Sequence, residues 1–284
     1  MPSFSHFCCC TMIFGVFISG CSTNTTPWTT YTDQDNNSKI CLSNNDGMLS
    51  YDEFPFLLDH PVSYWEGQNK NIDYEVTLEN NGNAIWDFRG NEEQDEEIDI
   101  VAHSIDENFL WYSEFFPAAM WYVEDAQNNH TLYSIDEDGI YVLGVASKEE
   151  NPQNAGKNLV VYPQGEERTK ILPFPLGVGS ELQVDIEIEN QTLNGFPFYG
   201  MHSYTTFVDD VGFLYIQNIG FLEAYRVHSS FEYQIQDQEP VLYRNTGFYV
   251  PCVGEVVRLA SHENEEDMNF LSVSKIQRLK WDGF

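Results

Sequence analysis

Carboxylates are the residues of this chain that could most directly do acid–base chemistry. An acidic run follows Gly90, and its members are Glu92, Glu93, Asp95, Glu96, Glu97 and Asp99. Two facing carboxylates can hydrolyse a glycosidic bond, one acting as the acid and the other as base or nucleophile. The chain has 45 acidic residues, however, so neighbouring carboxylates arise by chance in many places. We interpret the run as a solvent-exposed loop, and a carboxylate-based hydrolase is the least favoured function.

Other catalytic patterns are missing from the sequence. The histidines considered show neither the HxH nor the HExxH spacing of zinc sites; they are His60, His103, His130, His202, His228 and His262. Ser203 follows Gly200-Met201-His202 but lacks the second glycine of a nucleophile elbow. No glycine-rich phosphate loop is present. The sequence therefore assigns no catalytic residue, and we expect a protein that is not an enzyme.

Cys21 has the best-defined chemistry. It ends Ile18-Ser19-Gly20-Cys21, after an apolar run from about Phe7 to Ile18. The run is too short to span a bilayer but fits a signal-peptide core, and the four residues match a bacterial lipobox. We expect a lipoprotein signal peptide at 1–20 and acylation of Cys21. Residues 1–6 carry no Lys or Arg, so either the start is displaced or the signal is atypical; the alternative is a buried apolar segment.

The residues after Cys21 indicate where the lipid would hold the protein. Ser22 favours the outer membrane of a Gram-negative cell, because Asp at this position often retains a lipoprotein in the inner membrane. Each buried methylene of an acyl chain contributes about 0.8 kcal/mol, so two or three chains anchor firmly. Residues 22–39 are rich in Ser, Thr, Asn and Asp, so we expect residues 21–39 to form a flexible tether.

Two further cysteines support an oxidising compartment. Cys8, Cys9 and Cys10 would leave with the signal peptide, so Cys41 and Cys252 remain once Cys21 is acylated. An even pair in an exported protein favours a disulfide. The alternative is two unrelated buried thiols.

The segment from Asn44 to Phe54 resembles the second part of an EF-hand calcium loop. Asn44, Asp46, Ser50 and Glu53 fall at positions where that loop supplies oxygen ligands. Leu42 stands where the first carboxylate is expected, and no entry helix precedes it. The favoured alternative is a turn followed by a helix over 50–58, capped by a capping box of Ser50 and Glu53. Calcium is the one cofactor that the sequence suggests.

Composition excludes one class of partner. Thirteen basic residues stand against 45 acidic ones, which gives a net charge of −32. Such a surface repels phosphate backbones, so we expect no nucleic-acid binding. It also disfavours electrostatic docking on anionic lipid, so the membrane would be reached through acylated Cys21. A protein or small-molecule partner is not identified by the sequence.

Most of the folded region carries the alternation of β-strands. Short apolar–polar runs are broken by Gly, Asn, Asp and Pro, as at 121–124, 131–135, 139–145, 182–188 and 255–260. Strands in series without helices between them indicate an all-β fold of antiparallel meander sheets, curved or in a sandwich. We predict a hairpin turn at 209–212, separate strands at 224–229 and 232–235, and a short helix at 262–270. A polar stretch at 149–156 divides N-terminal (40–155) from C-terminal (156–284) β subdomains.

Several local phrases, in order, resemble uncharacterised extracytoplasmic β-rich lipoproteins of myxobacteria and relatives, with echoes in secreted proteins of Bacteroidota. They are Asp46-Gly47 with Glu53-Phe54-Pro55, Trp86-Asp87-Phe88, Phe116-Pro117-Ala118, Phe174-Pro175-Leu176 with Gly179, Gly212-Phe213-Leu214, Glu223-Ala224-Tyr225-Arg226-Val227, and the segment from Tyr249 to Gly254. The resemblance implies an extracytoplasmic location and an all-β fold. It carries over no catalytic residue.

The leading hypothesis is a lipid-anchored extracytoplasmic β protein with a structural or binding role. The alternative is a carrier or assembly factor that holds an apolar ligand in a concave sheet. Trp86, Trp111 and Trp121, with many Tyr and Phe, could line a groove, although such residues more often fill a sheet core.

Overall fold

A computed structural model describes residues 29–32, 38–73, 84–90, 94–105, 110–150, 158–217, 219–234 and 238–280. Residues 1–20, predicted as the signal peptide, and Cys21 lie outside this part of the chain. So does most of the predicted subdomain boundary at 149–156.

The described residues are almost entirely β-strand. The strands are β1 (Thr29–Thr32), β2 (Ser38–Cys41), β3 (Pro61–Asn71), β4 (Ala84–Phe88), β5 (Glu96–Ser104), β6 (Trp121–Glu124), β7 (Asn129–Asp136), β8 (Gly139–Ser147), β9 (Leu159–Val161), β10 (Thr169–Pro173), β11 (Glu181–Leu193), β12 (Phe196–Ile216), β13 (Ile219–Gln234), β14 (Val241–Val250), β15 (Gly254–Ser261) and β16 (Ser272–Leu279). The 3-10 helices of this part of the chain are η1 (Tyr51–Glu53), η2 (Ser113–Phe115) and η3 (Gly165–Glu167).

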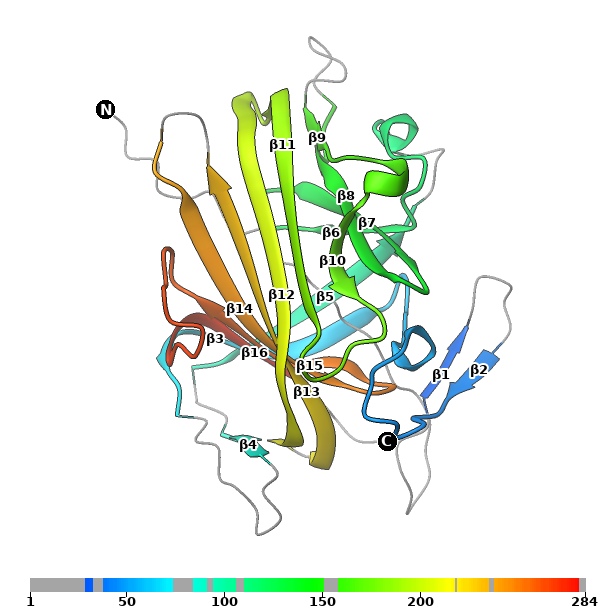
Figure 1. Cartoon of the computed structure of the whole chain (residues 1–284), viewed down its shortest axis with the longest axis vertical. Coiled ribbons are helices and arrows are strands. Elements are labelled where there is room, and N and C mark those ends of the chain that lie inside the picture. Colours follow the sequence, from blue (N-terminus) through cyan, green and yellow to red (C-terminus); the bar gives the residue numbers. More distant parts are fainter. Residues whose placement is uncertain are drawn as a thin grey trace.

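Twelve of the described strands close into a barrel (Figure 1). The ring runs β8-β7-β6-β5-β3-β16-β15-β14-β13-β12-β11-β9 and returns to β8, because β9 pairs with both β11 and β8. All neighbours in the ring are antiparallel, and most are consecutive in sequence, as in a meander. The other described strands lie outside the ring's path. β10 pairs with β8, β4 pairs parallel with the end of β12, and β1 and β2 form a two-stranded sheet that overlaps the end of the predicted tether at 21–39.

The ring closes at β9, and we call its junction with β11 the seam. This seam depends on side-chain amides. β9 and β11 share one pair of facing residues, Leu159 and Thr192. Beside it, the Gln191 amide accepts from the Val161 N–H at 2.6 Å and donates to the Val161 carbonyl oxygen at 3.0 Å. The side chain thus makes the two bonds that a neighbouring strand would make. Asn194 N–H donates to the Asn158 side chain at 2.6 Å and continues the seam.

Strand alternation divides the apolar side chains between two clusters. Tyr133 and Val142 belong to the main core with most buried residues of the barrel strands. Leu132 and Leu143, one position away on the same strands, belong to a second cluster under Tyr112. β8 is therefore buried along its whole length, because both of its faces are covered.

Cys41 and Cys252 form the predicted disulfide, with their Cα atoms 5.5 Å apart. It fastens the end of β2 to the turn between β14 and β15. The bridge spans 211 residues, and closing so long a loop would destabilise the unfolded chain by about 5 kcal/mol on the chain-entropy model.

The all-β fold and the antiparallel meander are confirmed, but several local predictions were wrong. Residues 209–212 do not turn and lie inside β12. The strands predicted at 224–229 and 232–235 are parts of the continuous β13 as far as Gln234. Residues 262–270 form turns rather than a helix, and the helix predicted over 50–58 is reduced to η1. Strands from 40–155 and from 156–284 belong to one ring.

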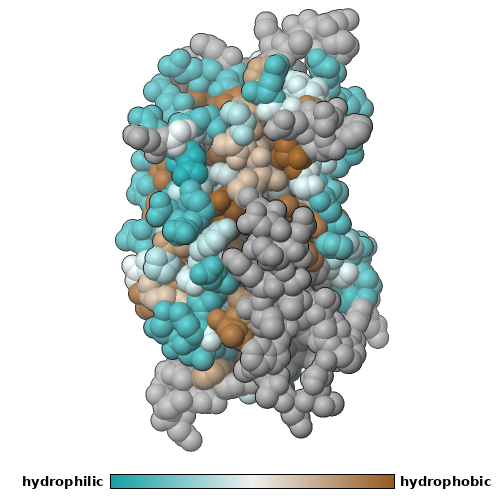
Figure 2. Space-filling view, turned by 90° about the vertical axis from the view of Figure 1, so that its right-hand side faces the viewer, coloured by the Kyte–Doolittle hydropathy of each residue, from teal (hydrophilic) through white to brown (hydrophobic). Residues whose placement is uncertain are grey.

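Hydrophilic residues predominate on the side of the barrel shown in Figure 2, with hydrophobic residues scattered among them. The described residues contain no helix with the length and apolar composition needed to cross a membrane.

We predict that Gln191→Leu opens the seam. The half-buried N–H and carbonyl of Val161 would lose their partners, at a cost of about 1–3 kcal/mol in the free energy of unfolding. Urea denaturation measures that cost, and hydrogen exchange should show lower protection at β9. Gln183→Leu is the control. Among the described residues, that exposed amide on the same strand forms hydrogen bonds only with the Asp185 carboxylate. Unchanged protection of β9 would contradict the role given to Gln191.

Candidate functional site

The pairing register of β11 to β14 places three rows of side chains on the outer face of the barrel. Each row takes one residue from each strand in that order. The first row is Glu181, Phe207, His228 and Thr246. The second is Gln183, Thr205, Ser230 and Arg244. The third is Asp185, Ser203, Glu232 and Leu242.

A groove follows these rows where their middle members are short. Ser203, Thr205 and Ser230 occupy the centre, while the longer Gln183 and Arg244 stand on the outer strands. The hollow has a volume of about 340 Å³, near the lower end for small-molecule sites. Its lining is Gln183, Ser203, Thr205, Phe207, His228, Ser229, Ser230, Glu232, Leu242, Arg244, Asn245 and Met268.

The polar walls of the groove are held in place by bonds to their surroundings. Arg244 donates from Nε to the Glu265 carbonyl oxygen at 2.8 Å, which orients the guanidinium against the loop before β16. Ser203 donates to the Asp185 carboxylate at 2.6 Å across the strand pair. Met268, from the same loop as Glu265, covers one side and is 37% exposed.

A relay of polar groups fixes His228 at the edge of the groove. A β-bulge in β12 leaves Asp209 between the paired Val208 and Asp210. Asp209 accepts from Arg226 at 2.8 and 2.5 Å, and His228 Nε2 lies 3.1 Å from the same carboxylate. Burial alone would raise the pKa of Asp209, but the bonds from His228 and Arg226 outweigh it and lower the pKa to about 2.

The relay ends on a hydroxyl that cannot reach a ligand. Thr246 Oγ1 lies 3.1 Å from His228 Nδ1, so hydroxyl, imidazole and carboxylate follow in the order of a nucleophilic triad. Thr246 is only 1% exposed, however. The arrangement therefore fixes His228 at the edge of the groove and supplies no accessible nucleophile.

Inside the barrel, a second polar group is fully paired. Arg258 Nε donates to the Glu255 carboxylate at 3.0 Å, and the Tyr64 hydroxyl donates to the Glu255 carbonyl oxygen at 3.1 Å. Burial raises the pKa of Tyr249 beside them. The cavity next to the pair measures about 10 Å³, room for one water at most.

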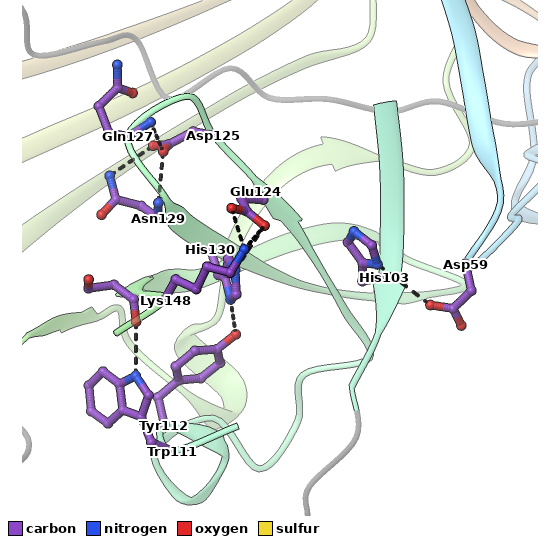
Figure 3. A network of polar contacts seen from close by, with 11 residues as sticks. Asp59, His103, Trp111, Tyr112, Glu124, Asp125, Gln127, Asn129, His130 and Lys148 are labelled. Atoms are coloured by element: carbon purple, nitrogen blue, oxygen red, sulfur yellow. Dashed lines mark hydrogen bonds and ion pairs between the residues drawn. The ribbon is translucent and has the colours of Figure 1, made fainter. Parts of the chain in front are cut away.

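A third polar network lies on the outer face of β5 to β8 (Figure 3). The Tyr112 hydroxyl lies 2.5 Å from His130 Nδ1, and Lys148 donates to Glu124 at 2.8 and 2.9 Å. Burial raises the pKa of Tyr112 and lowers that of His130, so a phenol O–H meets a neutral imidazole. Trp111 donates to the Ser147 carbonyl oxygen at 3.0 Å. These bonds fasten the segment before η2 to the barrel.

The residues predicted to bind calcium lie together in one loop, but their oxygens are engaged by the chain. The Glu53 carboxylate accepts from Asn44 N–H at 2.9 Å, from Ser50 N–H at 3.1 Å and from the Ser50 hydroxyl at 2.9 Å. Asp46 accepts from the Met48 N–H at 2.9 Å. The capping box of Ser50 and Glu53 is present. Among the described residues no cluster of three His, Cys, Asp or Glu is placed to hold a metal, and calcium binding stays a prediction.

Other residues singled out by the sequence have structural positions. The acidic run was wrongly interpreted as a loop from Asp95 onward, because Asp95 is buried against Arg278 and β5 begins at Glu96. Glu92 and Glu93 lie outside the described residues. Trp86 and Trp121 are buried in the core, as expected. Ser203, rejected as a nucleophile, lies in the groove.

Sequence reasoning missed the groove because it took β13 as two strands. Had β12 and β13 been aligned as one long hairpin, the Ser and Thr residues at alternate positions would have revealed a strip of short polar side chains. Asp209 could not have been placed, because its position depends on a bulge.

No protein-family model matches this chain, and no curated protein or solved structure is similar to it at a significant level.

We predict that Asp209→Asn lowers the free energy of unfolding by about 2 kcal/mol at pH 7, from a pKa depressed from 3.8 to about 2. A depressed carboxyl pKa stabilises the fold above its unfolded value and loses that contribution as pH falls through the folded value. The difference between wild type and variant should therefore be constant above about pH 5 and shrink toward pH 2.

Urea denaturation between pH 7 and pH 3 measures this difference. Asp210→Asn is the matched control, because among the described residues that carboxylate accepts a hydrogen bond only from its own neighbour, the Val211 N–H. A difference between wild type and Asp209→Asn that does not depend on pH would contradict the relay.

Proposed function

We propose that the protein is an extracytoplasmic binding protein, anchored in the outer membrane through acylated Cys21, whose outer-face groove takes a small polar ligand. The observation that carries the proposal is the contrast between the two sides of the sheet. Side chains fill the barrel interior, whereas the outer face of β11 to β14 is hollowed and lined by polar groups.

Two features support export. The disulfide between Cys41 and Cys252 needs an oxidising compartment to persist. The Ile18–Cys21 pattern and the resemblance to extracytoplasmic lipoproteins agree with it. The net charge of −32 leaves acylation, rather than electrostatic attraction, as the route to the membrane, and disfavours nucleic acid as a partner.

The alternative of a carrier for an apolar ligand has weaker support. Such a carrier needs an apolar cavity within its concave sheet. Here large side chains such as Trp121, Tyr133 and Phe231 occupy the core, and the cavity beside Glu255 and Arg258 is polar and about 10 Å³. The larger hollow among the described residues is outside the barrel and polar.

Export and anchoring can be tested with the full chain produced in a Gram-negative host. We expect wild type in the outer-membrane fraction, with an N-terminal peptide that begins at Cys21 and carries the mass of acyl chains. Cys21→Ser should leave that fraction. Wild type in the cytosol with residues 1–20 intact would refute the location and the anchor together.

Binding can be tested without knowing the ligand. We expect some members of a library of small polar compounds, which includes sugars, nucleotides, amino acids and organic acids, to raise the melting temperature of wild type. Ser230→Trp, which fills the groove from an outward and half-buried position, should abolish those shifts. Gln68→Trp on β3 is the control at an exposed strand position outside the groove. A library that shifts wild type and Ser230→Trp alike, or neither, would refute the groove as a binding site.

A further inference from the structure

We infer that the ligand of the groove is a short neutral oligosaccharide. The inference rests on the proposed function, that the groove of β11 to β14 binds a ligand, and it names the chemical class. Four features of the lining point to that class: its hydrogen-bonding groups, its apolar patches, its charge and its shape.

The hydrogen-bonding groups suit a ligand that both donates and accepts. Ser203, Thr205 and Ser230 supply hydroxyls, which do either. Arg244 supplies a planar fork of donors and Glu232 a carboxylate that accepts. A sugar offers neighbouring hydroxyl groups, each of which donates one bond and accepts others, so a pair of them can meet a planar group at two points. A ligand with acceptors alone would leave the Glu232 carboxylate without a partner.

Apolar surface is present in small pieces rather than as a continuous lining. Phe207, Leu242 and Met268 line the groove at separate points, and Met268 is 37% exposed. Most drug-like pockets are mainly apolar with few polar groups, and this groove has the opposite composition. A sugar ring matches it, because its C–H face packs on aliphatic or aromatic carbon while its rim is entirely hydroxyl.

The charge around the groove excludes an anionic sugar or a phosphate compound. Arg244 is the one Lys or Arg among the described residues of the lining. Glu232 lies in the groove, and Glu181 and Asp185 stand in the same three rows at the β11 side. With −32 on the chain, a second negative partner would be repelled. Within the lining itself the guanidinium of Arg244 balances the carboxylate of Glu232, so a cationic ligand gains no net attraction there and would face Arg244. The ligand is therefore neutral.

The shape favours a short chain over a single small molecule. The groove crosses three rows and has a volume of about 340 Å³. The exposed Gln183 and Glu232 stand at its rim, so it is open to solvent above the floor. An oligosaccharide can lie along such a groove and continue past it.

The test is an array of neutral and acidic di- to tetrasaccharides, with binding of the hits measured by calorimetry on the mature wild-type protein. We expect neutral oligosaccharides to bind and acidic ones of the same length not to bind. Ser230→Trp should abolish the heat and Gln68→Trp should retain it. Glu232→Gln should weaken affinity at least about tenfold, because a bond to a charged group contributes about 1.5–3 kcal/mol.

Three outcomes would overturn the inference, and they separate it from the proposed function. Binding of acidic saccharides in preference to neutral ones would refute neutrality. Groove-dependent melting shifts with nucleotides or organic acids, but with no saccharide, would refute the class and leave the binding protein standing. Saccharide binding that survives Ser230→Trp would place the site elsewhere.

Discussion

Closure of the strand ring at β9 is the constraint on which the rest of the structure depends. A sheet of this length with open edges would expose unpaired backbone groups along β11 and along the part of β8 that β10 does not pair. β9 is only three residues long and shares one residue pair with β11. The Gln191 amide completes the junction by bonding both backbone groups of Val161. One side chain thus stands in for the missing length of strand, at the position where the register of β11 shifts between Ile188 and Gln191.

Closure decides where a ligand can bind. Alternation sends every second side chain into the ring, and in this chain those side chains are large, so the interior becomes a core. The paired Glu255 and Arg258 within it satisfy each other and leave about 10 Å³. Function must then be built on the outer face. β12 and β13 are the longest pair of neighbouring strands in the ring. Side chains at their outward positions can be short, because packing inside the barrel already holds the strands together. The groove forms where these outward side chains are short.

The sequence predicted fold class well because alternation is a local signal. The strand at 121–124 has the bounds that the pattern indicates, and the disulfide followed from cysteine number and compartment alone. Predictions failed where distant contacts override local preference. Asp209 and Gly212 have turn chemistry, yet pairing with β13 on one side and with β4 on the other keeps this stretch of β12 extended. At Gly212 a Cβ would lie 2.5 Å from the Ala84 carbonyl oxygen, so the glycine serves close approach rather than a turn. The groove and the relay at His228 needed the register across four strands, which no single segment contains.

The acidity of the chain is compatible with the neutral ligand that we propose. Charge that would keep the proposed lipid-anchored protein soluble beside an anionic membrane also creates a field that attracts or repels ligands according to the sign of their charge. Screening limits this field to about 8 Å at physiological salt, so it acts on a ligand only close to the surface. A neutral ligand gains nothing from the field and must be selected by contact geometry. That geometry is rigid here, since the floor of the groove consists of strand residues and Arg244 is oriented by its bond to the Glu265 carbonyl. Selectivity for the proposed ligand then depends on which of its hydroxyls match the positions of the short polar side chains, and these positions are set by the pairing of β11 to β14.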